Sequence, residues 1–130
     1  MIIVKNKKLL LSLGLFFVAF LFTGCSLFNN VTTVGETILT SIVVDPAIMT
    51  IAKGGSKTIT SVTAYYDNGT SANIALSSCT YASNRTNVTV ANGKISVSAN
   101  CAATTATITV SYTEDNIPTT DTVNVTITGG

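Results

Sequence analysis

Few residues in this 130-residue chain could support catalysis, because the sequence contains no histidine. A serine or cysteine nucleophile needs a neighbouring base, and without histidine that base would have to be one of the few lysines. A zinc site takes about four nitrogen or sulfur ligands, which the cysteines alone do not provide. We therefore predict that the chain is not an enzyme and has no catalytic residues, no bound metal and no cofactor.

Acidic side chains are the other candidates for a ligand site. Glu114, Asp115 and Asn116 are consecutive, and together with Asp67 they could supply oxygen ligands to calcium. A loop built for calcium has a denser and more regularly spaced set of carboxylates, whereas turn formation explains the same residue types directly. We interpret these residues, and the nearby Asp121, as parts of turns.

A carbohydrate site would require an exposed aromatic ring, and Tyr65 is the candidate. It precedes Tyr66 in an expected strand, so the two side chains must point to opposite faces of the sheet. The plainer interpretation is an ordinary surface tyrosine in a strand.

The first 24 residues have the organisation of a secretory signal. Lys5, Lys7 and Lys8 precede an uncharged and mostly apolar run over residues 9–22. At about 1.5 Å per residue this run would span only about 21 Å as a helix, less than the roughly 30 Å of a bilayer core. Cleavage is therefore favoured over a permanent membrane span.

The end of this segment, LFTGC, resembles the lipobox of bacterial lipoproteins. The resemblance implies a signal peptide over residues 1–24 and a mature chain that begins at Cys25, which carries the lipid. Acyl chains would then hold the protein to the membrane without a spanning helix. In the lipoproteins of Gram-negative cells, an Asp after this cysteine favours retention at the inner membrane. The chain has Ser26 there, so we expect the outer membrane if the cell is Gram-negative.

Cys79 and Cys101 remain once Cys25 is assigned to lipid. They would lie outside the cytoplasm, where disulfides persist, and they allow only one intramolecular pairing. We therefore predict a disulfide between them. The alternative is two buried free thiols, because the sequence does not show whether their Cα atoms lie within about 7 Å of each other.

Residues 25–130 have the composition of a β-protein. They contain 22 threonines together with many valines and isoleucines, and β-branched residues favour strands over helices. Residues 25–37 lack sustained alternation and are expected to form a tether, which leaves residues 38–130 as the folded domain. Apolar residues alternate with polar ones in runs that begin near Ile42, Met49, Val62, Val88, Ile95, Ala106 and Val123.

This alternation buries one face of each strand and leaves the other face in water. Turn sequences such as Asp45-Pro46, Asn92-Gly93 and the DNIP of residues 115–118 separate the runs. We predict an all-β fold, an antiparallel β-sandwich of about seven to eight strands. Ile59 is out of phase with Val62, which predicts a bulge. The inward positions predict one core that includes Tyr81, Ile108, Val110, Val125 and Ile127.

Three segments carry a resemblance to the bacterial Ig-like family, in particular to the group 2 modules of invasin- and intimin-type proteins. They cover residues 40–74, 81–97 and 106–112, and they follow the family's order of a strand ending in Pro, a glycine turn, an aromatic followed by Ser, and an NG turn. Tyr81 stands where the family usually has Trp. The resemblance implies an Ig-like sandwich, and a link from Cys101 to Cys79 could hold the turn that glycine forms in other members.

The resemblance also implies a role at the bacterial cell envelope. We predict a lipid-anchored, non-catalytic Ig-like module for adhesion, structural display or protein docking, with a carbohydrate-binding module of the cell surface as the alternative. Its partners would be the membrane, through the N-terminal lipid, and a protein of the envelope or of a host or neighbouring cell. Residues 25–130 have four basic and six acidic side chains, a net charge of −2. This charge argues against binding of nucleic acid.

Overall fold

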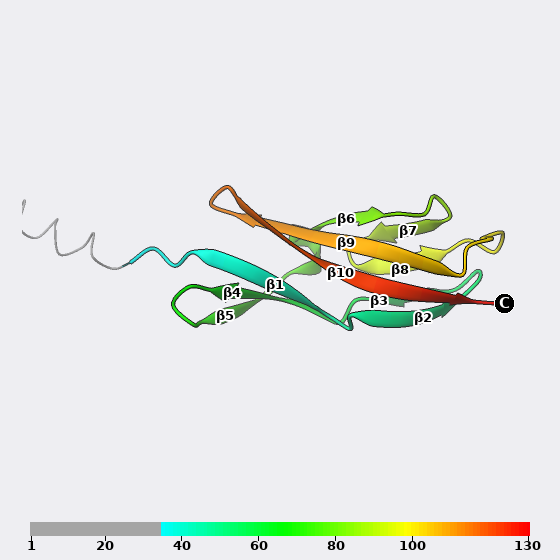
Figure 1. The fold of residues 1–130 in the computed structure, drawn as a ribbon, viewed down its shortest axis with the longest axis horizontal. Helices are drawn as coiled ribbons and strands as arrows, with labels where there is room; N and C mark the ends of the chain where they lie inside the picture. The colour runs from blue at the N-terminus through cyan, green and yellow to red at the C-terminus, as the bar shows by residue number, and fades with distance from the viewer. Residues whose placement is uncertain (1–34) are drawn as a thin grey trace, which may run out of the picture. The chain divides into compact units, whose positions relative to one another are not determined.

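The computed structural model describes residues 35–130, so Cys25, the predicted signal peptide and most of the predicted tether lie outside the described range. These residues form ten strands and one short 3-10 helix (Figure 1). No helix in this range is long and apolar enough to cross a bilayer. The elements are β1 (Leu39–Asp45), β2 (Ile48–Ala52), β3 (Ser56–Thr58), β4 (Ser61–Tyr66), β5 (Ser71–Ile74), η1 (Leu76–Ser78), β6 (Thr80–Ser83), β7 (Val88–Ala91), β8 (Lys94–Val97), β9 (Thr105–Glu114) and β10 (Ile117–Thr128).

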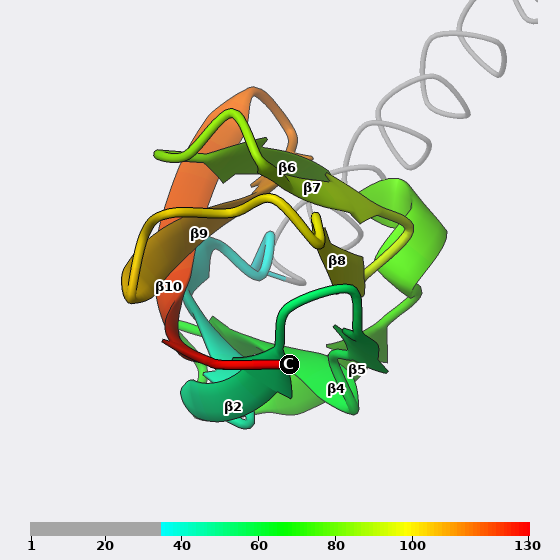
Figure 2. The same cartoon turned by 90° about the vertical axis from the view of Figure 1, so that its right-hand side faces the viewer.

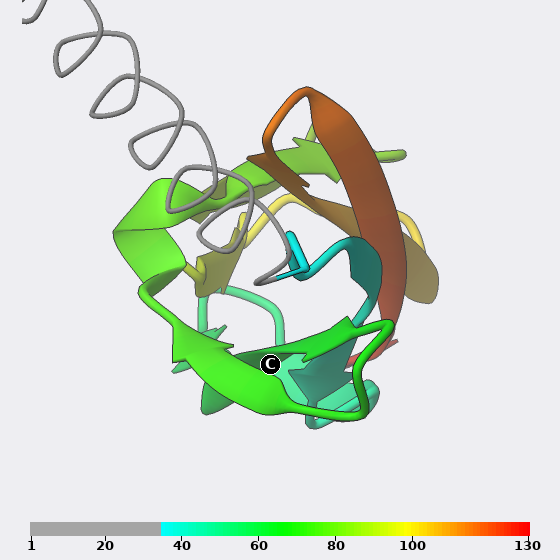
Figure 3. The same cartoon turned by 90° about the vertical axis from the view of Figure 1, so that its left-hand side faces the viewer.

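The strands form the two layers of a sandwich. One layer is the four-stranded sheet β2-β10-β9-β6, in which β2 runs parallel to β10 and the other neighbours are antiparallel. The other layer contains β1-β4-β5 and β3-β8-β7. Views along the long axis show the strands surrounding a common interior (Figures 2 and 3). This strand order is that of an Ig-like β-sandwich, which confirms the predicted fold class.

β1 and β2 are two parts of one long first strand, and each part belongs to a different layer. β1 pairs with β4, the chain passes through the cis Asp45-Pro46 peptide bond, and β2 then pairs with β10 in the opposite sheet. A second division separates β3 from β4, which are two parts of one extended stretch. The ten strands therefore exceed the predicted seven to eight because two long strands are each interrupted once.

The interruption between β3 and β4 lies at Ile59 and Thr60, close to the predicted bulge. The Ile59 N–H donates to the Gly93 carbonyl at 2.9 Å, and the Thr60 N–H donates to the Asp45 carbonyl at 2.8 Å. Both amides are therefore satisfied outside the regular ladder. The change of phase lets Ile59 join Val62 in the interior, where each is at most 1% exposed.

Two-residue turns close two of the hairpins. Asn92 and Gly93 have φ values of 47° and 80°, as the predicted NG turn requires. Asp115 and Asn116 have φ values of 49° and 63°, so this turn is shorter than the predicted DNIP turn. Pro118 lies inside β10 opposite Thr113, where a missing N–H near the start of the strand removes little of the ladder.

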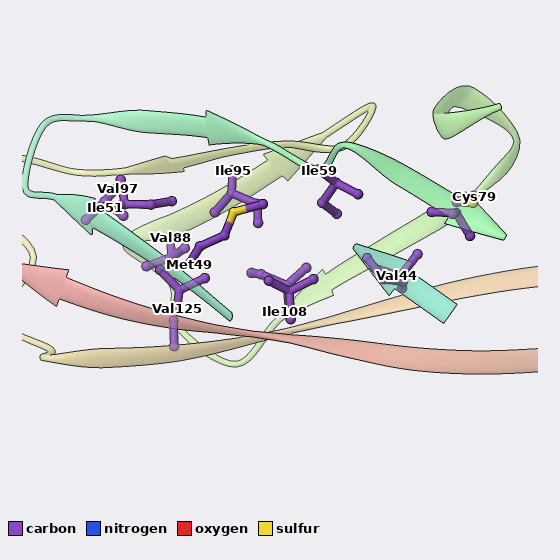
Figure 4. Packing of buried hydrophobic residues seen from close by; sticks show 14 of the residues in the cluster. Val44, Met49, Ile51, Ile59, Cys79, Val88, Ile95, Val97, Ile108 and Val125 are labelled. Atoms are coloured by element: carbon purple, nitrogen blue, oxygen red, sulfur yellow. The ribbon is translucent and has the colours of Figure 1, made fainter. Parts of the chain in front are cut away.

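The core lies between the sheets. Ile108, Val110, Val125 and Ile127 are between 0% and 5% exposed, and Tyr81 packs against this cluster while partly buried. This confirms the predicted shared core. Figure 4 shows buried side chains from both layers meeting in the interior. No polar or charged residue of the described domain belongs to the buried class.

Candidate functional site

Cys79 and Cys101 are both buried and both free, so the structure does not contain the predicted disulfide. The register explains why. Thr80 pairs with Ser111, which places Cys79 near the last residues of β9, whereas Cys101 precedes the first residue of β9. Tyr112 is seven positions after Thr105, and at a rise of about 3.3 Å per residue the two lie about 23 Å apart along the strand. A disulfide requires Cα atoms within about 7 Å.

The end of the sandwich near Cys79 is built around one carboxylate. The hydroxyls of Tyr66 and Tyr112 donate to the same Oε2 of Glu114, at 2.9 and 3.1 Å. Tyr66 belongs to β4 and Glu114 to β9, so this hydrogen bond joins the two layers. We call this region, with Tyr66, Tyr112 and Glu114, the tyrosine end.

The surroundings of these tyrosines favour the neutral phenol. The hydrogen bond to Glu114 raises the pKa of Tyr66 above its ordinary value. Burial, followed by the hydrogen bond to Glu114, raises the pKa of Tyr112. Burial also raises the pKa of Tyr81 to about 12, with Cys79 contributing in the same direction. These side chains therefore act as hydrogen-bond donors rather than as bases at neutral pH.

Tyr81 secures the short helix η1 from the same side. Its hydroxyl donates to the Leu76 carbonyl at 2.6 Å, which supplies the partner that a partly buried tyrosine hydroxyl needs. The Cys79 thiol lies 3.9 Å from the Ala75 carbonyl, and burial raises the pKa of this thiol. A raised pKa leaves this thiol mostly protonated at neutral pH, and the thiolate is the nucleophilic form of cysteine.

The carboxylates of Asp67 and Asp121 accept hydrogen bonds from backbone N–H groups. Asp67 accepts the Ile38 N–H at 2.9 Å. Asp121 accepts the Val44 N–H at 2.8 Å through Oδ2 and its neighbour's N–H at 2.8 Å through Oδ1. In residues 35–130 no group of three or more His, Cys, Asp or Glu could hold a metal ion. Each of Asp67, Glu114 and Asp121 therefore has a structural partner.

The opposite end of the sandwich is closed by apolar packing and backbone hydrogen bonds. Ile51, Val97, Cys101 and Ile127 are each between 2% and 5% exposed, and we call them the apolar end. The Gly54 N–H donates to the Val97 carbonyl at 2.9 Å, and the Ile127 N–H donates to the Thr104 carbonyl at 2.8 Å. Figure 4 shows Ile51 and Val97 together at one end of the core and Cys79 at the other.

The outer face of β1-β4-β5 contains the predicted carbohydrate candidate. Tyr65 is 42% exposed, and its cross-strand neighbours are Ser41 on β1 and Ser71 on β5. The next row of outward residues is Val43, Thr63 and Asn73. We call these six residues the Tyr65 face. None of them is charged, and the exposed Asp45 lies in the next outward row, opposite Ser61.

The outer face of the other layer is richer in threonine and has no aromatic side chain. Its two central strands present a double row of polar residues, and we call this set the threonine face: Thr105, Thr107, Thr109, Ser111, Thr120, Thr122, Asn124 and Thr126. The alternation in the sequence predicted the outward direction of five of these residues: Thr107, Thr109, Ser111, Asn124 and Thr126. It did not predict which outward residues of β1, β4 and β5 lie side by side, because the register between strands is not encoded in periodicity.

No protein-family model and no curated protein matches the sequence. Solved structures share the fold, and two of them are domains of one surface-layer protein. Domains 4 and 5 of the S-layer protein SbsC match with a TM-score of 0.50 and 21% identity over 71% of this chain and 53% of that chain. A structure of SbsC domains 4–9 matches with a TM-score of 0.52 and 20% identity over 73% of this chain and 15% of that one. The chain thus spans about half the length of the first structure, and at this identity the likeness is one of fold.

Proposed function

We propose that the chain is a lipid-anchored, non-catalytic module of the bacterial cell envelope, with its Ig-like sandwich used for structural display, adhesion or protein docking. The observation that carries this proposal is the position of the domain's two ends. The first strand begins at Leu39, which pairs with Tyr66 at the tyrosine end. Gly130 lies against Lys53 beyond the apolar end. Figure 1 shows the two ends of the sandwich far apart.

An attachment at Cys25 would therefore hold the sandwich by its tyrosine end. The chain would run from the lipid through the predicted tether into β1, and the domain would carry its surfaces away from that attachment. Such a rigid β-sandwich suits display of a face or a strand edge to another molecule. The membrane would be the outer membrane if the cell is Gram-negative.

Two further observations support this role. The carboxylates of Asp67, Glu114 and Asp121 each accept hydrogen bonds that fix the fold, which gives them structural rather than chemical tasks. The solved structures that share the fold are of a surface-layer protein, and a module of the cell surface agrees with that setting. We also propose that the sandwich is related to the group 2 bacterial Ig-like modules, on the resemblance carried by residues 40–74, 81–97 and 106–112.

Metabolic labelling with a palmitate analogue tests the anchor. Wild-type protein and a Cys79→Ala control should incorporate the label, fractionate with membranes and be digested when protease is added to intact cells. The Cys25→Ala variant should incorporate no label. Equal labelling of Cys25→Ala and wild type, or a wild-type protein that is protected from protease in intact cells and digested only after lysis, would contradict the proposal.

A further inference from the structure

We propose that the Tyr65 face binds an uncharged glycan chain. This inference names a ligand class that the proposed function leaves open, and it does not depend on the lipid anchor. It rests on one exposed aromatic ring, on the polar side chains beside that ring, and on the absence of charge among these six residues.

Tyr65 differs from the other three tyrosines of the chain. Tyr66, Tyr81 and Tyr112 are partly buried, and their hydroxyls are used in hydrogen bonds to Glu114 and to the Leu76 carbonyl. Tyr65 is 42% exposed, and its side chain makes no hydrogen bond within residues 35–130. The exposed part of its ring can contact the C–H groups of a sugar, and its hydroxyl is available to a sugar hydroxyl.

The residues around the ring supply the hydrogen-bonding groups that a sugar needs. Ser41 and Ser71 flank Tyr65 on the two neighbouring strands. The Thr63 hydroxyl donates to the Asn73 Oδ1 at 3.3 Å, and the NH₂ group of Asn73 remains as a hydrogen-bond donor. With neighbouring strands about 4.8 Å apart, these groups surround the ring on both sides.

The strands that carry the face are fixed locally. The Asn68 Oδ1 accepts the Thr70 N–H at 2.9 Å and the Thr70 hydroxyl at 2.6 Å, which closes the β4–β5 turn. The Thr40 hydroxyl donates to the Tyr65 carbonyl at 2.9 Å, which ties β1 to β4. A preformed platform loses less freedom when it binds, and this favours a ligand that offers only weak individual contacts.

The chemistry of the face selects a neutral glycan over other partners. A polyanion would find no positive side chain among the six residues, and a protein interface is usually centred on a cluster of aromatic and arginine residues. The threonine face is equally uncharged but has no aromatic ring. It therefore serves as an internal control surface on the same molecule.

The test uses the full chain in detergent and measures binding of neutral hexasaccharides, namely chitohexaose, cellohexaose and xylohexaose, with hyaluronan as the charged comparison. We expect at least one neutral hexasaccharide to bind. Tyr65→Ala should weaken that binding by about tenfold, Tyr65→Phe should preserve it within about threefold because the ring remains, and Asn73→Ala should weaken it less than Tyr65→Ala does. Thr122→Ala on the threonine face should change nothing.

Three results would overturn the proposal. These are no binding of any neutral hexasaccharide by the wild type, equal binding by wild type and Tyr65→Ala, and preference for hyaluronan. Tyr65→Phe keeps the test decisive if Tyr65→Ala fails to fold, because a tenfold loss in the phenylalanine variant would exclude ring stacking as the main contact. The palmitate experiment in cells can succeed or fail independently of each of these outcomes.

Discussion

The two ends of the sandwich are stabilised by different interactions, apolar packing at one end and hydrogen bonds to a carboxylate at the other. At the apolar end, Ile51, Val97, Cys101 and Ile127 bury their side chains almost completely. At the tyrosine end, the carboxylate of Glu114 accepts two phenol hydroxyls, one of them from the opposite layer. The first kind of closure depends on removal of apolar surface from water. The second depends on hydrogen bonds at a partly exposed site, so it contributes less stability and responds to pH.

Removing packing at the apolar end should have the largest effect. Ile51 is 2% exposed, and Ile51→Ala should lower the free energy of unfolding by about 2 to 5 kcal/mol because it leaves a cavity. The neighbouring Thr50 is exposed, and Thr50→Ser should change that free energy by less than about 0.5 kcal/mol. Urea denaturation measures both. Equal, small losses would mean that β2 contributes little to the core.

A middle-sized effect is expected where Asp121 links the first strand to β10. The Asp121 Oδ2 accepts the Val44 N–H at 2.8 Å, and Asp121→Ala leaves that donor without its carboxylate partner. The free energy of unfolding should fall by about 1 to 3 kcal/mol, against less than about 0.5 kcal/mol for Thr120→Ala at an exposed site on the same strand. Faster amide exchange at Val44 in Asp121→Ala should accompany the loss. Unchanged exchange at Val44 would contradict the assigned contact.

The tyrosine end should tolerate substitution better than the apolar end. Glu114→Gln retains an acceptor but removes its charge, and charge-assisted hydrogen bonds are the stronger kind. The expected loss is about 1 kcal/mol, clearly smaller than that of Ile51→Ala in the same urea series. A loss as large as that of Ile51→Ala would mean that the two ends do not differ in the way described.

The sequence predicted the apolar end better than the tyrosine end. Alternation placed Ile51, Val97 and Ile127 of the apolar end at inward positions, because a half-buried strand must place apolar residues at every second position. The contact between Tyr66 and Glu114 joins residues 48 positions apart. Periodicity contains no information about which polar residues meet across the two layers, so Glu114 was interpreted only as part of a turn.

The cysteines, the Asp45-Pro46 turn and the neighbours of Tyr65 show the same limit of the sequence. It predicted local features but not which segments meet in the fold. Counting Cys79 and Cys101 gave a plausible pairing, but the register places them toward opposite ends of β9. The sequence identified Asp45-Pro46 as a turn, yet it did not show that the chain changes sheets there. The Tyr65 candidate was found from its strand position, whereas its neighbours Ser71 and Asn73 required the pairing of β4 with β5.

Alkaline pH should also separate the two ends, because it acts on the tyrosine end. The pKa of Tyr81 is raised to about 12, and the pKa values of Tyr66 and Tyr112 are also above their ordinary value of 10.0. A raised pKa in the folded chain means that the unfolded chain releases these protons first. The stabilisation is therefore complete below about pH 10 and is lost as the pH rises toward 12.

Urea unfolding between pH 8 and about pH 12 should show this decline, and Tyr81→Phe should reduce it because one titrating phenol is removed. The thiol of Cys79 acts in the same direction, since burial raises its pKa above 9.0. A free energy of unfolding that stays constant over this range would exclude the tyrosines as a pH-sensitive part of the fold.

The most direct test of the difference between the two ends is a titration of the chain's four tyrosines, followed by the ultraviolet absorbance of tyrosinate. We predict that tyrosine ionises at higher pH in the native chain than in the chain unfolded in urea. Glu114→Gln should move the native curve back toward lower pH, because the hydrogen bond to Glu114 is the main cause of the raised pKa of Tyr66. Superimposed native and unfolded curves, or a native curve unchanged by Glu114→Gln, would contradict the assignment of Glu114 as the polar link between the two layers.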